Sequence, residues 1–185
     1  MALLSKYMAG KRYGEIAPYI KGHVLELGCQ NATVLTNYGS NITGYCGVEK
    51  SASLVKRLSK TYPEARFVQC DLDKDELVME GVFDCVLMLA LIEHLYNQKF
   101  VMEGVVRALK PGGIVAITTP TILGNDIVLP LGAAMRLFAK SALDQHIVIY
   151  NRKRFVNLAK AVGLSLTHHH YFQAFCNQVA ILEKP

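Results

Sequence analysis

The chain reads VLELGCQNA from Val24 to Ala32, and this stretch decides the fold. A largely apolar segment ends at Leu27, and Gly28 follows it at once. Glycine at such a point lets the chain turn sharply and lets a ligand come close to the backbone. The stretch therefore predicts a first strand, a tight turn and a ligand at the carboxyl end of that strand.

Two acidic residues follow the next two expected strands. Glu49 comes directly after residues 42–48, about 20 residues beyond the glycine turn, where a carboxylate can accept both ribose hydroxyls of a nucleoside. Asp71 comes directly after residues 66–70 and is expected to reach an adenine amino group. The Gly28 turn, Glu49 and Asp71 each follow one of three successive expected strands. Together they indicate a nucleoside site more specifically than any one of them alone.

Strand-like and helix-like segments alternate along the rest of the chain. The continuous apolar run at 82–89 is typical of a central parallel strand that is covered on both faces. Alternation of this kind predicts a mostly parallel sheet with right-handed crossovers. Strands are expected at 23–27, 42–48, 66–70, 82–89, 114–118, 164–167 and 176–182, the last two antiparallel, and helices at 3–20, after Ser51, after Asn97 and at 151–162.

Length and composition fit one globular domain over residues 1–185. Hydrophobic residues make up 51% of the chain and charged residues 19%. The net charge of +5 is mild, and the basic residues are scattered apart from 152–154, which is interpreted as a solvated helix start. The sequence therefore gives no strong nucleic-acid signal.

The cysteines and the lengths of the apolar runs indicate the cellular compartment in which the protein is expected. Five cysteines, an odd number without CxxC spacing, fall in or beside expected strands, where they act as small buried hydrophobes. The chain start lacks the apolar run of a signal peptide, and no stretch reaches 18 apolar residues. We expect a reduced, cytoplasmic protein without a transmembrane segment.

Two segments stand outside the alternation. Residues 1–21 form a leading helix of mixed polarity, whose Tyr7, Tyr13 and Tyr19 either cover a ligand or belong to the core. Residues 120–150 are expected to form an insertion, with an apolar helix at 129–139, at the sheet edge where ligands bind in such folds. It is a lid or acceptor-binding element, or else a surface helix packed on the core; a membrane-surface role is less favoured.

The motifs together resemble the class I S-adenosylmethionine-dependent methyltransferases, especially their small-molecule group. The matching segments are VLELGC (24–29), YCGVEKS (45–51), FVQCDLD (67–73), FDCVLMLALIEHL (83–95) and ALKPGGIVAITTP (108–120). The resemblance implies a Rossmann-like α/β fold, a seven-stranded, mostly parallel sheet of order 3-2-1-4-5-7-6 with helices on both faces. It also implies S-adenosylmethionine as cofactor and in-line methyl transfer to a small-molecule acceptor. A homodimer is a possible assembly, although the sequence does not reveal the oligomeric state.

The same resemblance implies a set of cofactor-binding residues and shows two positions at which this chain differs from the family's glycine motif. The residues are Glu26, Gly28, Cys29, Gln30, Glu49, Lys50, Asp71, Leu72, Leu89 and Ala90. Gln30 and Ala32 stand where the family has its second and third glycines. These changes motivate one alternative, a catalytically inactive binding or regulatory protein. They disfavour another, a nicotinamide enzyme, because a pyrophosphate needs the second glycine.

Glu93 and His94 are the predicted catalytic residues, because they follow the strand that ends at the cofactor. Either could act as a base, or Glu93 could cap the next turn while His94 packs locally. Some related enzymes hold a metal with Glu-x-x-Glu-His, but Ala90 occupies the first position here, so we predict no metal. His168–His170 are interpreted as strand histidines rather than ligands. By position alone, His146 and Tyr150 could line an acceptor pocket.

Overall fold

The computed structural model describes residues 3–79, 81–124 and 147–185, with side chains from residue 10 onward. None of the helices in these ranges has the length and apolar character needed to cross a bilayer. The elements are α1 (Leu3–Ile16), η1 (Ala17–Tyr19), β1 (Gly22–Leu27), α2 (Thr33–Tyr38), η2 (Gly39–Asn41), β2 (Ile42–Glu49), α3 (Ala52–Thr61), β3 (Arg66–Gln69), β4 (Phe83–Leu89), η3 (Ile92–His94), α4 (Gln98–Ala108), β5 (Leu109–Pro120), α6 (Arg152–Val162), β6 (Ser165–Phe172) and β7 (Asn177–Glu183).

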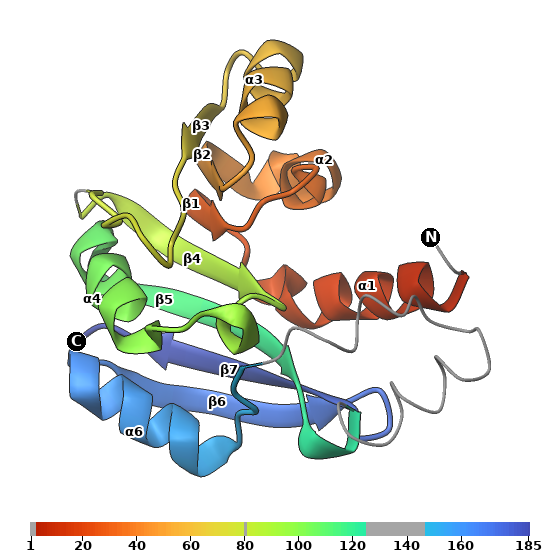
Figure 1. Ribbon diagram of the computed structural model, residues 1–185, viewed down its shortest axis with the longest axis vertical. Coiled ribbons are helices and arrows are strands. Elements are labelled where there is room, and N and C mark those ends of the chain that lie inside the picture. The colour runs from red at the N-terminus through yellow and green to blue at the C-terminus, as the bar shows by residue number, and fades with distance from the viewer. Residues whose placement is uncertain (1–2, 80, 125–146) are drawn as a thin grey trace.

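The sheet has seven strands in the order β3-β2-β1-β4-β5-β7-β6 (Figure 1). The first five in that order pair in parallel, and β7 pairs antiparallel with both β5 and β6. The strand order expected from the sequence is confirmed. Because β1 and β4 are neighbours whose connections leave in opposite directions, their carboxyl ends flank the switch point where such sheets bind ligands.

Helices cover both faces of the sheet and bury two apolar layers. On one face, α4 and α6 contribute Val101, Met102, Val105 and Phe155 to a cluster with Leu25, Val86 and Ile117. Helices α1 and α2 lie on the other face (Figure 1). There Ile16 of α1 and Val34 of α2 belong to a cluster with Val24, Leu87 and Ala116. The strand residues alternate between the two layers, as the two-residue period of a strand requires. All five cysteines are free and buried.

Helix boundaries follow local side-chain chemistry. The side chains of Ser51, Asn97 and Asn151 each accept a backbone N–H three residues ahead, at the starts of α3, α4 and α6. Gly163 ends α6 with a left-handed φ of 78°, which glycine adopts at little cost. The starts expected after Ser51 and Asn97 and the stop at Gly163 are therefore confirmed.

Other boundaries differ from the expectation. The leading helix ends at Ile16, because Pro18 lies in a 3₁₀ turn. The six-residue α2 is too short to show a helical repeat in the sequence. β5 begins at Leu109 rather than 114 because Leu109 pairs with Phe83, with a register shift beyond it. β6 and β7 are also longer than expected or shifted by a residue, and the helix expected at 129–139 lies outside the described residues.

Candidate cofactor and acceptor site

The turn after β1 is closed by backbone hydrogen bonds. The N–H groups of Gly28 and Cys29 both donate to the carbonyl of Val48, over 2.8 and 3.1 Å. Gly28 has a φ of 72°, and a Cβ there would lie 3.3 Å from Leu91 Cδ1. A side chain at this position would therefore strain the backbone and crowd the end of β4.

Gln30 and Ala32 keep the backbone shape that glycine normally supplies. Their φ angles are 45° and 53°, in the left-handed region that costs ordinary residues roughly 1 kcal/mol or more. Gln30 is exposed, whereas Ala32 is buried beside Cys29 and Leu58. The substitutions therefore preserve the turn rather than destroy it.

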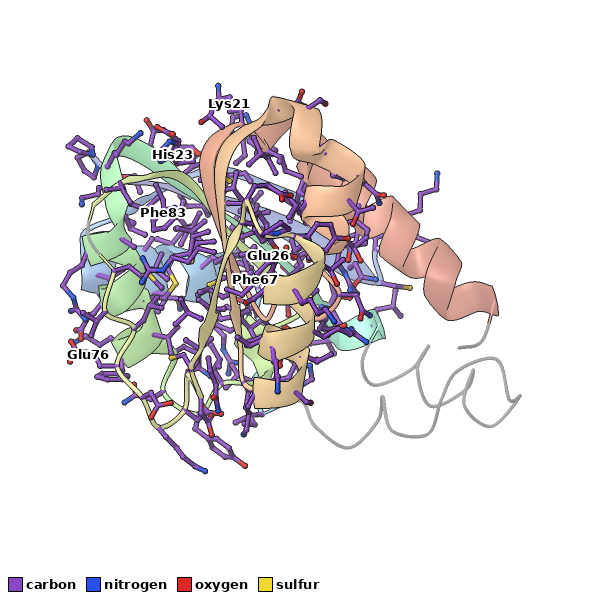
Figure 2. All side chains as sticks on the ribbon, turned by 90° about the horizontal axis from the view of Figure 1, so that it is seen from above. Lys21, His23, Glu26, Phe67, Glu76 and Phe83 are labelled. Atoms are coloured by element: carbon purple, nitrogen blue, oxygen red, sulfur yellow. The ribbon has the colours of Figure 1, made fainter. Side chains whose placement is uncertain are left out.

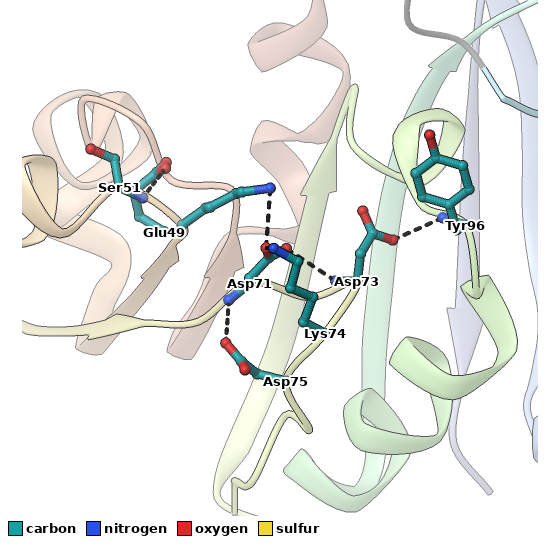
Figure 3. A network of polar contacts seen from close by, with 8 residues as sticks. Glu49, Ser51, Asp71, Asp73, Lys74, Asp75 and Tyr96 are labelled. Carbon is teal, nitrogen blue, oxygen red and sulfur yellow. Dashed lines mark hydrogen bonds and ion pairs between the residues drawn. The ribbon is translucent and has the colours of Figure 1, made fainter.

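The carboxylate of Glu49 is held in one orientation at the end of β2. One oxygen accepts from Gln30 N at 3.1 Å, and the other accepts from Ser51 N at 3.0 Å. Figure 3 shows the Ser51 contact. Each carboxylate oxygen has further lone pairs, so both can still accept from a ligand hydroxyl. Glu49 thus presents a fixed pair of acceptors.

Asp71 lies in a charged network beyond β3 (Figure 3). Its carboxylate is 3.1 Å from Lys50 Nζ and 3.4 Å from Lys74 Nζ. The hydrogen bond from Lys50 is the main cause that lowers the pKa of Asp71, so this group is ionised at neutral pH. The backbone N–H of Asp71 donates to Asp75 at 2.8 Å, which orders the loop beside the pocket.

A pocket of about 470 Å³ opens between these strand ends. That volume is within the range of small-molecule sites. Eight of the ten predicted cofactor residues line it: Gly28, Gln30, Glu49, Lys50, Asp71, Leu72, Leu89 and Ala90. Asp73, Leu91 and Leu95 also line it, and no sequence signal singled them out.

Glu26 and Cys29 do not line this pocket; they lie beneath the turn. Glu26 is 4% exposed and accepts a hydrogen bond from the hydroxyl of Tyr45. Burial raises the pKa of Glu26 to about 8, although the bond from Tyr45 lowers it. Burial likewise raises the pKa of Cys29 to about 12. In Figure 2 Glu26 lies in the interior, while Lys21 and Glu76 lie at the surface.

The two predicted catalytic residues are placed differently. His94 lines the pocket, whereas Glu93 is fully buried beside it. Neither carboxyl oxygen of Glu93 has a hydrogen-bond partner in the described part of the chain, so this side chain does not cap the following turn. Burial raises the pKa of Glu93, and the nearby backbone N–H, followed by His94 and Arg12, counteracts this rise only in part.

The histidine run has structural partners. His170 Nε2 is 2.8 Å from a carboxylate oxygen of Glu15, and His169 Nε2 is 2.9 Å from the side-chain oxygen of Gln178. His168 lies near the ring of Tyr19. In the described ranges, no three His, Cys, Asp or Glu side chains are grouped as a metal site would require.

The remaining candidate residues are the tyrosines and the residues around 147–150. Tyr150 is buried against Phe155, and Tyr13 is half-buried on α1. Ile147 N and Val148 N donate to the carbonyl of Glu93 at 2.8 and 3.3 Å, so the backbone at these two residues is held against Glu93. His146 and the side chain of Tyr7 lie outside what the structure describes.

Comparisons with known proteins agree with this geometry. A family model described as a methyltransferase domain matches residues 10–169. A ubiquinone biosynthesis O-methyltransferase from Dechloromonas aromatica is 30% identical over 100 residues, which cover 52% of this chain and 43% of that protein. The match thus spans less than half of that relative.

Solved structures share the fold at low sequence identity. An S-adenosylmethionine-dependent methyltransferase from Mesorhizobium loti superimposes with a TM-score of 0.73 at 15% identity, covering 96% of this chain and 100% of that one. A Haloferax volcanii methyltransferase complex with the activator Trm112 gives 0.72 at 14%, covering 97% and 92%. The chain therefore belongs to the methyltransferase-domain family, and its class I fold and family imply S-adenosylmethionine as cofactor.

Proposed function

We propose that this protein transfers a methyl group from S-adenosylmethionine to a small-molecule acceptor. The observation that carries the proposal is the Glu49 carboxylate, fixed by two backbone N–H groups at the rim of a 470 Å³ pocket beside the Gly28 turn. A carboxylate held in this way can accept hydrogen bonds from two ribose hydroxyls without losing further side-chain freedom.

The other pocket residues fit the remaining parts of the cofactor. Asp71 offers an acceptor for an adenine amino group, and Leu72 offers an apolar surface for the ring. Leu89 and Ala90 form the floor at the end of β4, next to the open backbone of Gly28. Glu26 and Cys29 support the turn from below, where the former binds Tyr45.

The protein's task in the chemical step is alignment and, for some acceptors, proton removal. The bound cofactor supplies a methyl group already activated by its sulfonium. Holding an acceptor in line can contribute roughly 7–11 kcal/mol. A base is needed when the acceptor is a hydroxyl or a protonated amine. His94 at the pocket wall and Glu93 behind it are the groups that could remove that proton.

Calorimetry with S-adenosylmethionine and S-adenosylhomocysteine tests the proposal. We expect binding by the natural chain and a loss of at least tenfold in Glu49→Gln, because the new amide directs N–H groups at a backbone donor. Glu76→Gln is the matched control, since Glu76 is exposed and pairs only with Arg107 in the described structure. No heat with either ligand at millimolar concentration would refute the proposal.

A further inference from the structure

The crossover from β3 to β4 contains no helix in its described part. β3 ends at Gln69 and β4 begins at Phe83, and residues 70–79, 81 and 82 form turns and irregular backbone. Connections between parallel strands usually carry a helix, which satisfies its own backbone hydrogen bonds. An irregular segment instead keeps its shape through contacts with the rest of the fold. The contacts that hold this crossover therefore also hold whatever it contributes to the cofactor pocket.

The beginning of the crossover forms one wall of that pocket. Residues 70–73 all line it, and we call them the crossover wall. The segment after β4 lines the same pocket with Leu91, His94 and Leu95. β3 is an edge strand, and β2 and β1 lie between it and β4 in the sheet. The two lining segments thus come from strands that are not neighbours, and the pocket requires contacts that hold them close together.

A side-chain hydrogen bond joins these two segments. Asp73 Oδ1 accepts from Tyr96 N at 2.8 Å, as Figure 3 shows. Each partner directly follows a pocket-lining leucine, Leu72 in the crossover wall and Leu95 after β4. Both leucines are buried in the same apolar cluster. Asp73 N also donates to the Asp71 carboxylate at 3.4 Å. Asp73 therefore binds the segment after β4 through its side chain and Asp71 through its backbone.

The rest of the crossover is held farther along α4. Glu76 pairs with Arg107 in the last turn of α4, over 2.7 Å. Leu77 is 3% exposed and packs on Gly104, where a Cβ would lie 2.9 Å from Leu77 Cβ. Neither Glu76 nor Leu77 lines the pocket. Asp73 is thus the residue that holds the crossover at its pocket end.

Other contacts of the crossover wall do not replace the Asp73–Tyr96 hydrogen bond. Asp71 N donates to Asp75, but both residues belong to the crossover, so this bond orders the loop without attaching it to another segment. Lys50, after β2, pairs with Asp71, but the lysine side chain is 69% exposed. Exposed ion pairs of this kind hold a loop only weakly.

We propose that Asp73 is a positioning residue for the cofactor, because its bond to Tyr96 N holds Asp71 and Leu72 at the pocket. This inference rests on the proposed function, in which Asp71 and Leu72 contact the adenine. When the bond is removed, the crossover wall spends part of its time out of place. The apparent affinity for the cofactor then falls in proportion to the fraction of chains whose wall is in place.

Calorimetry with S-adenosylhomocysteine tests the effect on binding. Asp73→Ala removes the acceptor for Tyr96 N, so the affinity should fall by about three- to tenfold. Asp73→Asn keeps an oxygen that can accept from Tyr96 N and should restore the affinity to within about twofold. Glu76→Ala is the matched control, because it removes a bond of similar length outside the pocket, and it should also stay within about twofold.

The same variants separate positioning from general stability. Asp73 and Glu76 are both exposed, so the melting temperatures of all three variants should stay within about 2 °C of the natural chain. An unchanged affinity in Asp73→Ala would overturn the inference. Equal losses in Asp73→Ala and Asp73→Asn, or in Asp73→Ala and Glu76→Ala, would overturn it as well.

Amide hydrogen exchange of the full chain tests the hydrogen bond without any ligand. The Tyr96 amide should exchange about tenfold faster in Asp73→Ala than in the natural chain, and close to the natural rate in Asp73→Asn. Equal exchange in the natural chain and Asp73→Ala would overturn the inference whatever the cofactor does. If the natural chain bound no S-adenosylhomocysteine, the proposed function and this inference would both fail. Binding that Asp73→Ala leaves unchanged would refute the inference alone.

Discussion

The carboxylates at the two halves of the sheet edge are treated in opposite ways. Glu49 and Asp71, after β2 and β3, are held by backbone N–H groups and lysines. Glu93, after β4, is fully buried and has no hydrogen-bond partner in the described structure. All three follow parallel strands, so strand position alone does not distinguish them.

This difference separates two carboxylates that are oriented at the pocket from a carboxyl group that is buried behind it. A carboxylate already fixed by the backbone has its orientation set before a ligand arrives, and it loses little entropy on binding. Burial of a carboxyl group such as Glu93 disfavours its charged form and raises its pKa. In the proposed function, Glu49 and Asp71 are therefore oriented in advance for the cofactor, whereas Glu93 lies behind the pocket wall.

The largest expected effect comes from Glu93→Gln. If Glu93 receives the acceptor proton, kcat should fall by roughly 10²–10⁴-fold, the range typical of a lost general base. The affinity for S-adenosylhomocysteine should stay within about twofold, because Glu93 does not line the cofactor pocket. Single-turnover methyl transfer and calorimetry measure the two quantities. An equal loss of cofactor affinity in Glu93→Gln would show that Glu93 also supports cofactor binding, as Glu49 and Asp71 are proposed to do.

Glu26 provides a buried carboxylate on the cofactor side and a pH test. Because burial raises its pKa to about 8, the folded chain keeps a proton that the unfolded chain releases. The resulting stability is complete below the unfolded pKa and is lost as pH rises through the folded pKa. The free energy of unfolding should fall by about 2 kcal/mol between about pH 6 and about pH 8.

Glu26→Gln should remove most of that slope, since the amide does not titrate and can still accept from Tyr45. Denaturant titrations at several pH values measure it, with Glu76→Gln as an exposed control. An equal slope in the Glu26 variant and the natural chain would mean that Glu26 is ionised throughout this range.

The glycine turn predicts a smaller effect that differs between two positions. Gln30→Gly relieves a left-handed residue that is exposed, so the free energy of unfolding should rise by about 0.5–1 kcal/mol. Ala32→Gly relieves the same strain but removes a buried methyl group, so the two effects should nearly cancel. Urea denaturation measures both. If Ala32→Gly stabilised the chain and Gln30→Gly did not, the expected difference between the two positions would be wrong.

The Gln30→Gly variant also tests the alternative that the chain is a catalytically inactive binding or regulatory protein. If the turn already has the shape that the cofactor requires, Gln30→Gly should change the affinity for S-adenosylhomocysteine by no more than a few-fold. Binding that appears only after the glycine is restored would instead support a natural chain that does not bind the cofactor.

Lys50 should give the smallest effect. Its ammonium is 3.1 Å from Asp71, but the lysine side chain is 69% exposed, and exposed ion pairs contribute about 0.2–1 kcal/mol. Lys50→Met should therefore weaken cofactor binding by about two- to fivefold, and less at high salt. Calorimetry at two salt concentrations checks this. A loss of cofactor affinity as large as that in Glu49→Gln would indicate that Lys50 contacts the cofactor directly.

Most of the fold could be predicted because its signals are local. The apolar run at 82–89 marks the central strand, and the caps at Ser51, Asn97 and Gly163 set helix ends through contacts a few residues long. α2 was missed because six residues do not show a repeat. The start of β5 was misplaced because its pairing with Phe83 depends on a distant strand.

The pocket edge could be predicted from local patterns: a glycine, then acidic residues after successive strands, which parallel pairing must bring to one side of the sheet. The burial of Glu26 against Tyr45 and of Glu93 behind the pocket wall emerges only in the folded chain. The reason is physical. Strand order follows from local patterns and handedness, whereas the burial and partners of a side chain depend on elements apart in the chain, here β1 and β2 for Glu26 and η3 and β5 for Glu93.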